Sequence, residues 1–294
     1  MSHKIQIFNF HSISDKVSAS YPSIPVKVFK RLCAFLDRNY FIAPLHDIEQ
    51  NFRTKKPVGI ITFDDGFADF YENALEILTE KKISPTQHLI TGCVVSGQTL
   101  WSQKLNDLID AYYVNSQQVV IPEMGIDVKL KHKKNAEKLC LQIFYKILND
   151  PTLLYIVDNL EKSFTGEIRF ARMMNQEQIR ECLRYNVSFG SHTVSHKNLT
   201  LLSRLELEHE VAGSKLAIER ITGNSACLSL AFPNGQYNER VIEACKKAGY
   251  RFLLTTVARS VTPQVNRFEL PRFDIFGTNY WKNLLKITSF KYFR

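Results

Sequence analysis

The 294-residue chain has an ordinary globular composition, with 45% hydrophobic and 23% charged residues, which excludes a disordered chain, and no fixed-period repeat predicts a solenoid. Its formal net charge is +9, but many basic residues gather in residues 129–138 and 280–294, where a solvated surface explains them as well as an anionic partner does. Since charge alone would support a nucleic-acid partner, we expect none.

Seven short apolar or alternating segments bounded by turn residues predict β-strands. In chain order they are residues 5–10, 59–63, 86–91, 187–191, 228–233, 251–256 and 270–275. Helical patterns separate several of them, with one apolar face running from Phe67 to Leu78 and another from Leu207 to Ile221. This alternation predicts an α/β fold with a mostly parallel sheet or barrel, whose ligands bind at the carboxyl ends of the strands.

Residues 99 to about 180 interrupt this alternation. They are helical in composition and rich in Lys, Leu and Asn, and no linker rich in Pro, Gly or Ser separates them from the rest. We therefore predict a single domain over residues 1–294 with a helical insertion at about 99–180.

The stretch GIITFDDGF, residues 59–67, ends a predicted strand with two adjacent carboxylates, Asp64 and Asp65. Like charges so close together need a compensating partner, and we predict that Arg272, a cation within an apolar strand, pairs with Asp64. Neighbouring strand residues point to opposite faces, whereas a turn at Gly66 would let both carboxylates reach one cleft. A simple turn is the alternative interpretation.

A second cluster, SHTVSH, places His192 and His196 directly after another predicted strand. The alternative is one buried and one surface histidine. Together with one carboxylate of the aspartate pair, the two imidazoles would hold a divalent ion with open positions for water and substrate. The ion would also lower the cost of adjacent carboxylates and leave the second one for acid–base chemistry.

Two further strand ends carry candidate site residues. His11 ends the first strand in FNFHSIS, where a structural role is the alternative. Phe232, Pro233 and Asn234 follow another strand with turn chemistry. This turn either only reverses the chain or forms a wall whose backbone N–H groups face the reacting centre, as an oxyanion site needs.

The chain resembles the polysaccharide deacetylases of carbohydrate esterase family 4, the NodB-homology group. The matching pieces are TFDDGF, SHTVSH, FPNG and LPRF, and FNFHSIS is similar to the amino-terminal YH-containing segment of the branch that acts on poly-N-acetylglucosamine. The resemblance covers most of the chain apart from the insertion. It implies a distorted (β/α) barrel of about seven strands.

Carried over by position, the resemblance makes Asp64 the general base. It makes Asp65, His192 and His196 the ligands of a divalent metal ion, with zinc expected. The histidine near the carboxyl terminus that serves much of the family as general acid has no counterpart, because no histidine follows residue 209.

In the YH branch the acid role moves to the first strand, which implies His11 here. Phe10 stands where that segment has its tyrosine. The predicted function is therefore metal-dependent hydrolytic N-deacetylation of an N-acetylated sugar. The alternatives are a non-catalytic carbohydrate-binding protein on the same barrel and an amidohydrolase acting on a non-sugar C–N bond.

Location and partners follow from weaker signals. Six scattered cysteines without a CxxC pair predict free buried thiols, and neither a secretory signal nor an apolar run of about 18 residues is found. We therefore expect a cytoplasmic protein acting on a nucleotide- or lipid-linked glycan intermediate. The basic residues 280–294 could rest on the anionic inner face of a membrane; a packed terminal helix is the alternative.

Overall fold

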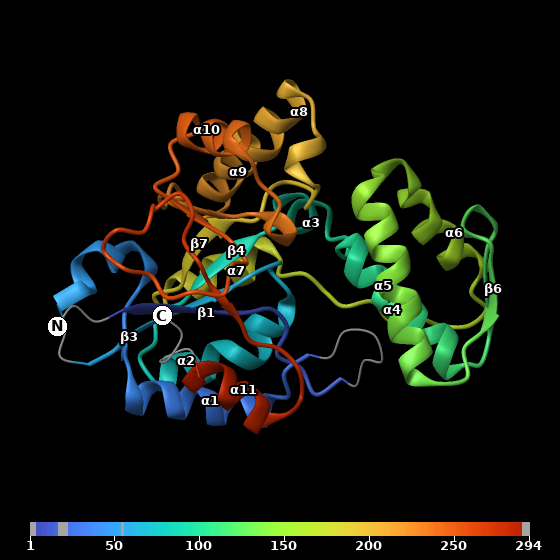
Figure 1. Ribbon diagram of the computed structural model, residues 1–294, viewed down its shortest axis with the longest axis horizontal. Helices are drawn as coiled ribbons and strands as arrows, with labels where there is room; N and C mark the ends of the chain where they lie inside the picture. The colour runs from blue at the N-terminus through green and yellow to red at the C-terminus, as the bar shows by residue number, and fades with distance from the viewer. Residues whose placement is uncertain (1–3, 17–22, 54–55, 290–294) are drawn as a thin grey trace.

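The computed structural model of the protein describes residues 4–16, 23–53 and 56–289. Its main sheet is parallel and runs in the order β10-β1-β3-β4-β7-β8-β9, with the short β2 beside β3 (Figure 1). The strands are β1 (Ile5–Phe10), β2 (Phe41–Ile42), β3 (Val58–Phe63), β4 (Thr86–Leu89), β7 (Ser188–Ser191), β8 (Ser229–Ala231), β9 (Phe252–Leu254) and β10 (Phe273–Asp274).

The curl of this sheet gives the predicted distorted (β/α) barrel. Each of the seven predicted segments overlaps one strand of the sheet, and the α/β fold class is confirmed. An isolated parallel bridge between Leu254 and Leu270 links β9 to the chain just before β10, so the two ends of the strand order approach each other. The short β2 was not predicted.

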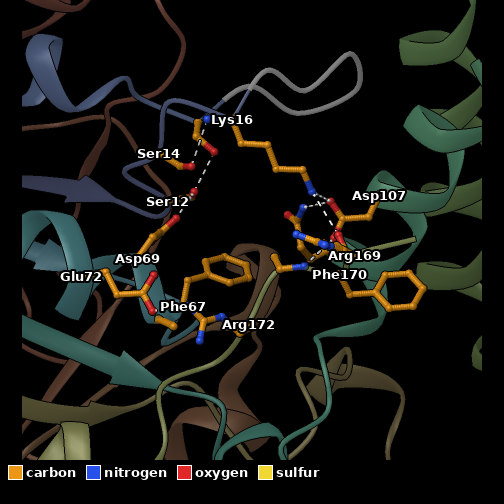
Figure 2. A pocket seen from close by; sticks show the side chains of 14 residues that line it. Ser12, Ser14, Lys16, Phe67, Asp69, Glu72, Asp107, Arg169, Phe170 and Arg172 are labelled. Carbon is orange, nitrogen blue, oxygen red and sulfur yellow. Dashed lines mark hydrogen bonds and ion pairs between the residues drawn. The ribbon is translucent and has the colours of Figure 1, made fainter. Parts of the chain in front are cut away.

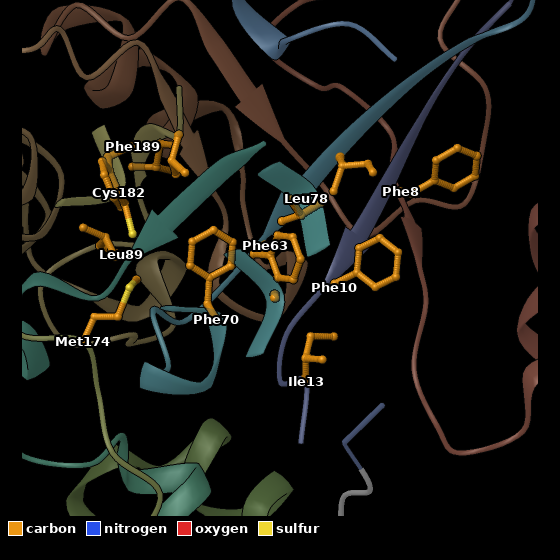
Figure 3. Close-up of a cluster of buried hydrophobic side chains, with 14 of the residues drawn as sticks. Phe8, Phe10, Ile13, Phe63, Phe70, Leu78, Leu89, Met174, Cys182 and Phe189 are labelled. Carbon is orange, nitrogen blue, oxygen red and sulfur yellow. The ribbon is translucent and has the colours of Figure 1, made fainter. Parts of the chain in front are cut away.

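The central strands β1 and β3 are buried along their whole lengths. Burial on both faces agrees with their mainly apolar sequences, IQIFNF and VGIITF, which do not alternate strictly between apolar and polar residues. Figure 3 shows the phenylalanines that they contribute to the main core. The Phe10 and Phe63 rings stack with centroids 5.4 Å apart, and Phe70 meets Phe63 edge to face at 4.8 Å.

Helices cover the sheet on its outer side. They are α1 (Val26–Asn39), α2 (Leu75–Glu80), α3 (Thr91–Ser96), α7 (Gln176–Leu183), α8 (Arg204–Glu208), α9 (Ser214–Ile221), α10 (Glu239–Lys247) and α11 (Tyr280–Ser289). In Figure 1, α8, α9 and α10 lie together above the sheet and α1, α2 and α11 below it. Short π-helical turns precede α2 and α9.

The segment between α3 and α7 lies beside the barrel in Figure 1. It contains α4 (Trp101–Val114), α5 (Lys133–Asn149) and α6 (Tyr155–Ser163), together with a hairpin of β5 (Gln118–Ile121) and β6 (Ile126–Lys129) that was not predicted. These elements bury a hydrophobic cluster of their own. Ile179 and Cys182 of α7, in contrast, belong to the main core, and the single-domain organisation stays a prediction.

The described part of the carboxy-terminal segment forms α11, which packs on α1. Ile287 is fully buried, the Tyr40 hydroxyl donates to its carbonyl oxygen, and the Arg31 guanidinium lies 3.8 Å from the centre of the Tyr280 ring. The alternative interpretation, a packed terminal helix, therefore describes this segment. The structure does not support membrane contact through it. Residues 290–294 lie outside the described part of the chain.

The state of the cysteines and the presence of membrane-spanning helices can both be compared with the sequence-based predictions. All six cysteines are described and none forms a disulfide, as predicted; five are buried and Cys93 is half-buried. Among the described helices, none is both long and apolar enough to cross a bilayer.

Candidate active site

The carboxyl ends of the barrel strands meet at one cleft, with a cavity of about 290 Å³. Because parallel strands all end at the same edge of the sheet, residues far apart in sequence converge there. The cleft is lined by nearly all of the predicted site residues, namely His11, Asp64, Asp65, His192, His196, Phe232 and Asn234.

A tight turn after β3 sends the two adjacent aspartates in different directions. Asp65 has a φ of 74° and Gly66 a φ of 85°, so two consecutive residues are in the left-handed region, which non-glycine residues seldom adopt. Asp64 turns toward β1, β4 and β10, whereas Asp65 turns toward the histidines that follow β7. Both side chains are buried.

Asp65, His192 and His196 form the candidate metal site within the described residues, and each offers one ligand atom within 4.8 Å of the others. The Asp65 Oδ1 lies 3.6 Å from the His192 Nε2 and 3.9 Å from the His196 Nε2. Two atoms bound to one ion at about 2.0–2.2 Å lie roughly 3–4 Å apart. The spacing therefore fits a shared divalent ion.

Hydrogen bonding and burial prepare both imidazoles as ligands. The His192 Nδ1 lies 2.8 Å from the Ala231 carbonyl oxygen, which can only accept, so Nδ1 carries the proton and Nε2 keeps its lone pair for a metal. Burial, followed by the neighbouring His192, holds the pKa of His196 well below its ordinary value. Neutral imidazole is the form that binds metal ions.

Four donors surround the Asp64 carboxylate. The predicted pair with Arg272 is present and bidentate, with Nη1 to Oδ1 and Nη2 to Oδ2 both at 2.8 Å. The Asn9 amide donates to Oδ2 at 3.0 Å, and the His88 Nδ1 lies 3.1 Å from Oδ1. An ionised carboxylate has about four lone-pair sites, so these donors occupy all of them.

The two aspartates differ in acidity because their surroundings differ. Burial alone would raise the pKa of Asp64, but the charge of Arg272, the neighbouring His192 and the hydrogen bonds from His88 and Arg272 outweigh it and hold the pKa well below its ordinary value. Burial raises the pKa of Asp65, although His11 and His192 oppose the shift. Asp64 is thus held ionised by protein donors, whereas Asp65 has no such set of donors among the described residues.

His88 is part of the site although sequence reasoning assigned it no role. Its Nδ1 lies close to two acceptors, the Phe63 carbonyl oxygen at 3.3 Å and the Asp64 Oδ1, so Nδ1 carries the proton. Burial lowers the pKa of His88, which leaves Nε2 to accept from the Ser229 hydroxyl at 3.0 Å. A polar residue inside a buried strand needs partners, and this was the missed signal.

The space for the His88 ring depends on a glycine in the neighbouring strand. A Cβ at Gly190 would collide with the His88 ring and the Ser229 hydroxyl. Strands β4, β7 and β8 therefore contribute His88, Gly190 and Ser229 as a matched set behind Asp64.

Of the remaining predicted residues, His11, Phe232 and Asn234 line the cleft, whereas Pro233 is buried and does not line it. His11 follows β1, and it opposes the rise that burial causes in the pKa of Asp65. Phe232 is fully buried and stacks on Tyr237. Asn234 has a φ of 53°, and its buried Nδ2 has no hydrogen-bond partner among the described residues.

A second cavity of about 320 Å³ adjoins the cleft, with Phe67 and Gln103 lining both. Figure 2 shows its charged lining, in which Lys16 reaches Asp107 at 2.9 Å. Arg172 pairs with Glu72 at 2.6 Å. These pairs neutralise much of the charge in this cavity.

Comparisons with known proteins identify the family. The family model described as polysaccharide deacetylase matches residues 51–121 and 148–253. YxkH of Bacillus subtilis (strain 168), named for the polysaccharide deacetylases, is 24% identical over 169 residues, which cover 54% of this chain and 59% of YxkH. The chain thus spans less than two thirds of this relative.

Solved structures share the fold over almost the whole chain. The deacetylase PplD of Streptococcus pyogenes, solved with acetate, has a TM-score of 0.66 at 19% identity and covers 97% of this chain and 98% of its own. IcaB from Ammonifex degensii has a TM-score of 0.63 at 15% identity and covers 97% and 96%. Because the family model matches more than half of the residues, the chain belongs to the polysaccharide deacetylase family.

Proposed function

We propose that the protein removes the acetyl group of an N-acetylated sugar by metal-dependent hydrolysis. The observation that carries the proposal is the Asp65, His192 and His196 set beside a second, separately held carboxylate in one cleft. When bound, the ion would polarise the acetyl carbonyl and acidify a water molecule. Zinc suits a site of two imidazoles and one carboxylate.

Asp64 would take the proton of the attacking water. Its lone-pair sites are occupied, so one donor has to give way to that water. Two of the four contacts form the bidentate, charge-assisted pair with Arg272, and these are the strongest. The water would therefore replace one of the neutral donors, Asn9 or His88. Arg272 would keep the carboxylate oriented while Asp64 takes the proton.

Asn234 would stabilise the negative charge of the oxyanion, and His11 would act on the departing amine. The unpartnered Nδ2 of Asn234 can donate to an oxygen of the substrate, and the neighbouring backbone N–H can face the oxyanion, as preorganised donors do in acyl transfer. His11 would protonate the departing amine. The branch with the amino-terminal YH-type segment, from which this role of His11 is carried over, stays a prediction.

Replacement of His11 tests the acid role. We expect His11→Gln to lower kcat about 10²–10⁴-fold, because a positioned acid contributes that much, while metal content stays at the wild-type level. Acetate release and metal analysis on the same preparation check this. A variant that keeps wild-type kcat, or that loses its metal, would contradict the assignment.

The finer identity of the substrate stays a prediction from the sequence. A nucleotide- or lipid-linked glycan intermediate and a cytoplasmic location belong to this proposal. A non-catalytic sugar binder would release no acetate, and an amidohydrolase for a non-sugar C–N bond would leave N-acetyl sugars untouched.

The test is acetate release from soluble, nucleotide-linked and lipid-linked N-acetyl sugars, with and without a chelator. We expect release from at least one sugar class, its loss on chelation and its recovery when Zn²⁺ is added back. Release that is indifferent to chelation would overturn the metal dependence. Binding without release would favour the sugar binder.

A further inference from the structure

The two neutral donors to Asp64 lie on different sides of its carboxylate. Asn9 lines the cleft, as Asp64 itself does, whereas His88 is fully buried and is not part of that lining. An attacking water molecule arrives through the cleft, so it reaches the Asn9 side of the carboxylate. The position of His88 is therefore that of a group that holds Asp64, not of one that gives way to water.

Residues from β3, β7 and β8 enclose the His88 ring. Its Nδ1 lies 3.1 Å from the Asp64 Oδ1 and 3.3 Å from the carbonyl oxygen of Phe63 in β3. Its Nε2 lies 3.0 Å from the hydroxyl of Ser229 in β8. In β7, even one added carbon at Gly190 would collide with the ring, so the ring fills the space available to it. A water molecule could take its place at Oδ1 only by pushing the ring out of a close-packed interior.

Asn9 differs from His88 because its amide has a second acceptor on the cleft side. The Asn9 Nδ2 donates to the Asp64 Oδ2 at 3.0 Å and to the Asp274 Oδ1 at 2.9 Å, and Asp274 also lines the cleft. When a water molecule takes the place of Asn9 at Oδ2, the amide keeps its bond to Asp274. The exchange therefore leaves no buried donor unsatisfied.

We propose that His88 is a positioning residue that, together with Arg272, fixes the Oδ1 of Asp64 and leaves Oδ2 to act as the base. Oδ1 accepts from the Arg272 Nη1 at 2.8 Å and from His88. Oδ2 accepts from the Arg272 Nη2 and from Asn9, and Asn9 is the donor that the water displaces. An O–H bond of that water breaks, its proton goes to Oδ2 and its oxygen bonds to the acetyl carbon. This inference rests on the proposed deacetylation.

The test compares His88→Leu with His88→Asn in Zn²⁺-loaded protein. The two new side chains have the same branched shape, but only the amide of the second places an N–H₂ group near the present position of Nδ1. The substrate is the soluble, nucleotide-linked or lipid-linked N-acetyl sugar from which the wild type releases acetate fastest. We expect His88→Leu to lower kcat at least about tenfold, as the loss of an orienting partner does, with KM and metal content unchanged. His88→Asn should keep most of the wild-type kcat.

The matched pair separates positioning from packing. Both replacements leave the same space beside Gly190, so we expect equal falls in unfolding temperature. A role in packing alone would lower kcat equally in both. His88→Gln gives the same comparison if His88→Leu does not fold, because the longer amide fills more of the space and can still meet the Ser229 hydroxyl. Its amide group lies near the position of Nε2 and not of Nδ1, so we expect it to lose kcat as His88→Leu does.

Two results would overturn the inference and leave the deacetylation standing. Wild-type or higher kcat in folded His88→Leu or His88→Gln would mean that the water displaces His88. A kcat for His88→Asn as low as that of the variant without the donor would reduce His88 to a packing residue. Wild-type protein that releases acetate from none of the N-acetyl sugars would overturn the proposed function, and this inference with it.

Discussion

Asp64→Asn is expected to lose about 10²–10⁴-fold in acetate release while keeping its metal, because a positioned general base contributes that much to the rate. The substitution preserves the shape of the side chain but removes the charge. An amide N–H₂ at this position would also face donors from Arg272 and either Asn9 or His88. Metal content separates this loss from damage to the Asp65 site, because Asp64 contributes no ligand to the set.

We expect Asp64→Asn to lower the free energy of unfolding as well as the rate. A second variant separates the loss of stability from the loss of catalysis. Removing one partner of a buried ion pair costs about 3–5 kcal/mol, and Arg272 is as deeply buried as Asp64. Arg272→Gln breaks the same pair but keeps the carboxylate, so we expect a similar loss of unfolding free energy and a smaller loss of kcat. Full activity in folded Asp64→Asn, or equal kcat losses in both variants, would contradict the base assignment.

The convergence of the site was predictable because it follows from topology. Short apolar or alternating segments separated by helical patterns predicted parallel strands, and the carboxyl ends of parallel strands lie at one edge. Asp64, His192 and His11 each directly follow such a run. Their meeting in one cleft therefore needed no knowledge of loop conformation.

What could not be predicted depends on side-chain packing between strands. Asn9 and His88 lie inside buried strands, and their roles depend on which neighbours the sheet order gives them. Asn9 accepts from Arg272 and Thr62 while donating to Asp64 and Asp274. No single segment of sequence contains that network. The left-handed backbone of Asp65 was also hidden, because Gly66 alone accounted for a turn.

Amino-acid composition predicted the helices of the inserted segment but not its hairpin. Its overall content predicted helices, and α4, α5 and α6 are present. The hairpin β5–β6 was missed because it is short and lies between long helices. Gly125, with a φ of 61°, ends the turn that joins its strands, and the alternating burial of β5 is a strand signal that a compositional argument averages away.

His192→Ala is expected to lose both the metal and the activity. The variant removes one of three ligands and the donor to the Ala231 carbonyl oxygen. Changes to groups that only orient a ligand cost about 10–100-fold in affinity, so loss of a ligand should cost more. Metal analysis should show about one Zn²⁺ per wild-type chain and almost none in the variant, and acetate release should fall to background.

Thermal unfolding gives a second measurement that does not depend on activity. A ligand that binds only the folded state adds about 4.1 kcal/mol at a thousand times its Kd, so a chelator should lower the unfolding temperature of the wild type and leave that of His192→Ala unchanged. His209→Ala is the matched control, because His209 is exposed and outside the candidate metal site. It should keep metal, activity and the response to chelation. A His192→Ala protein with stoichiometric metal would exclude His192 as a ligand, because a site without its imidazole would have held the ion equally well.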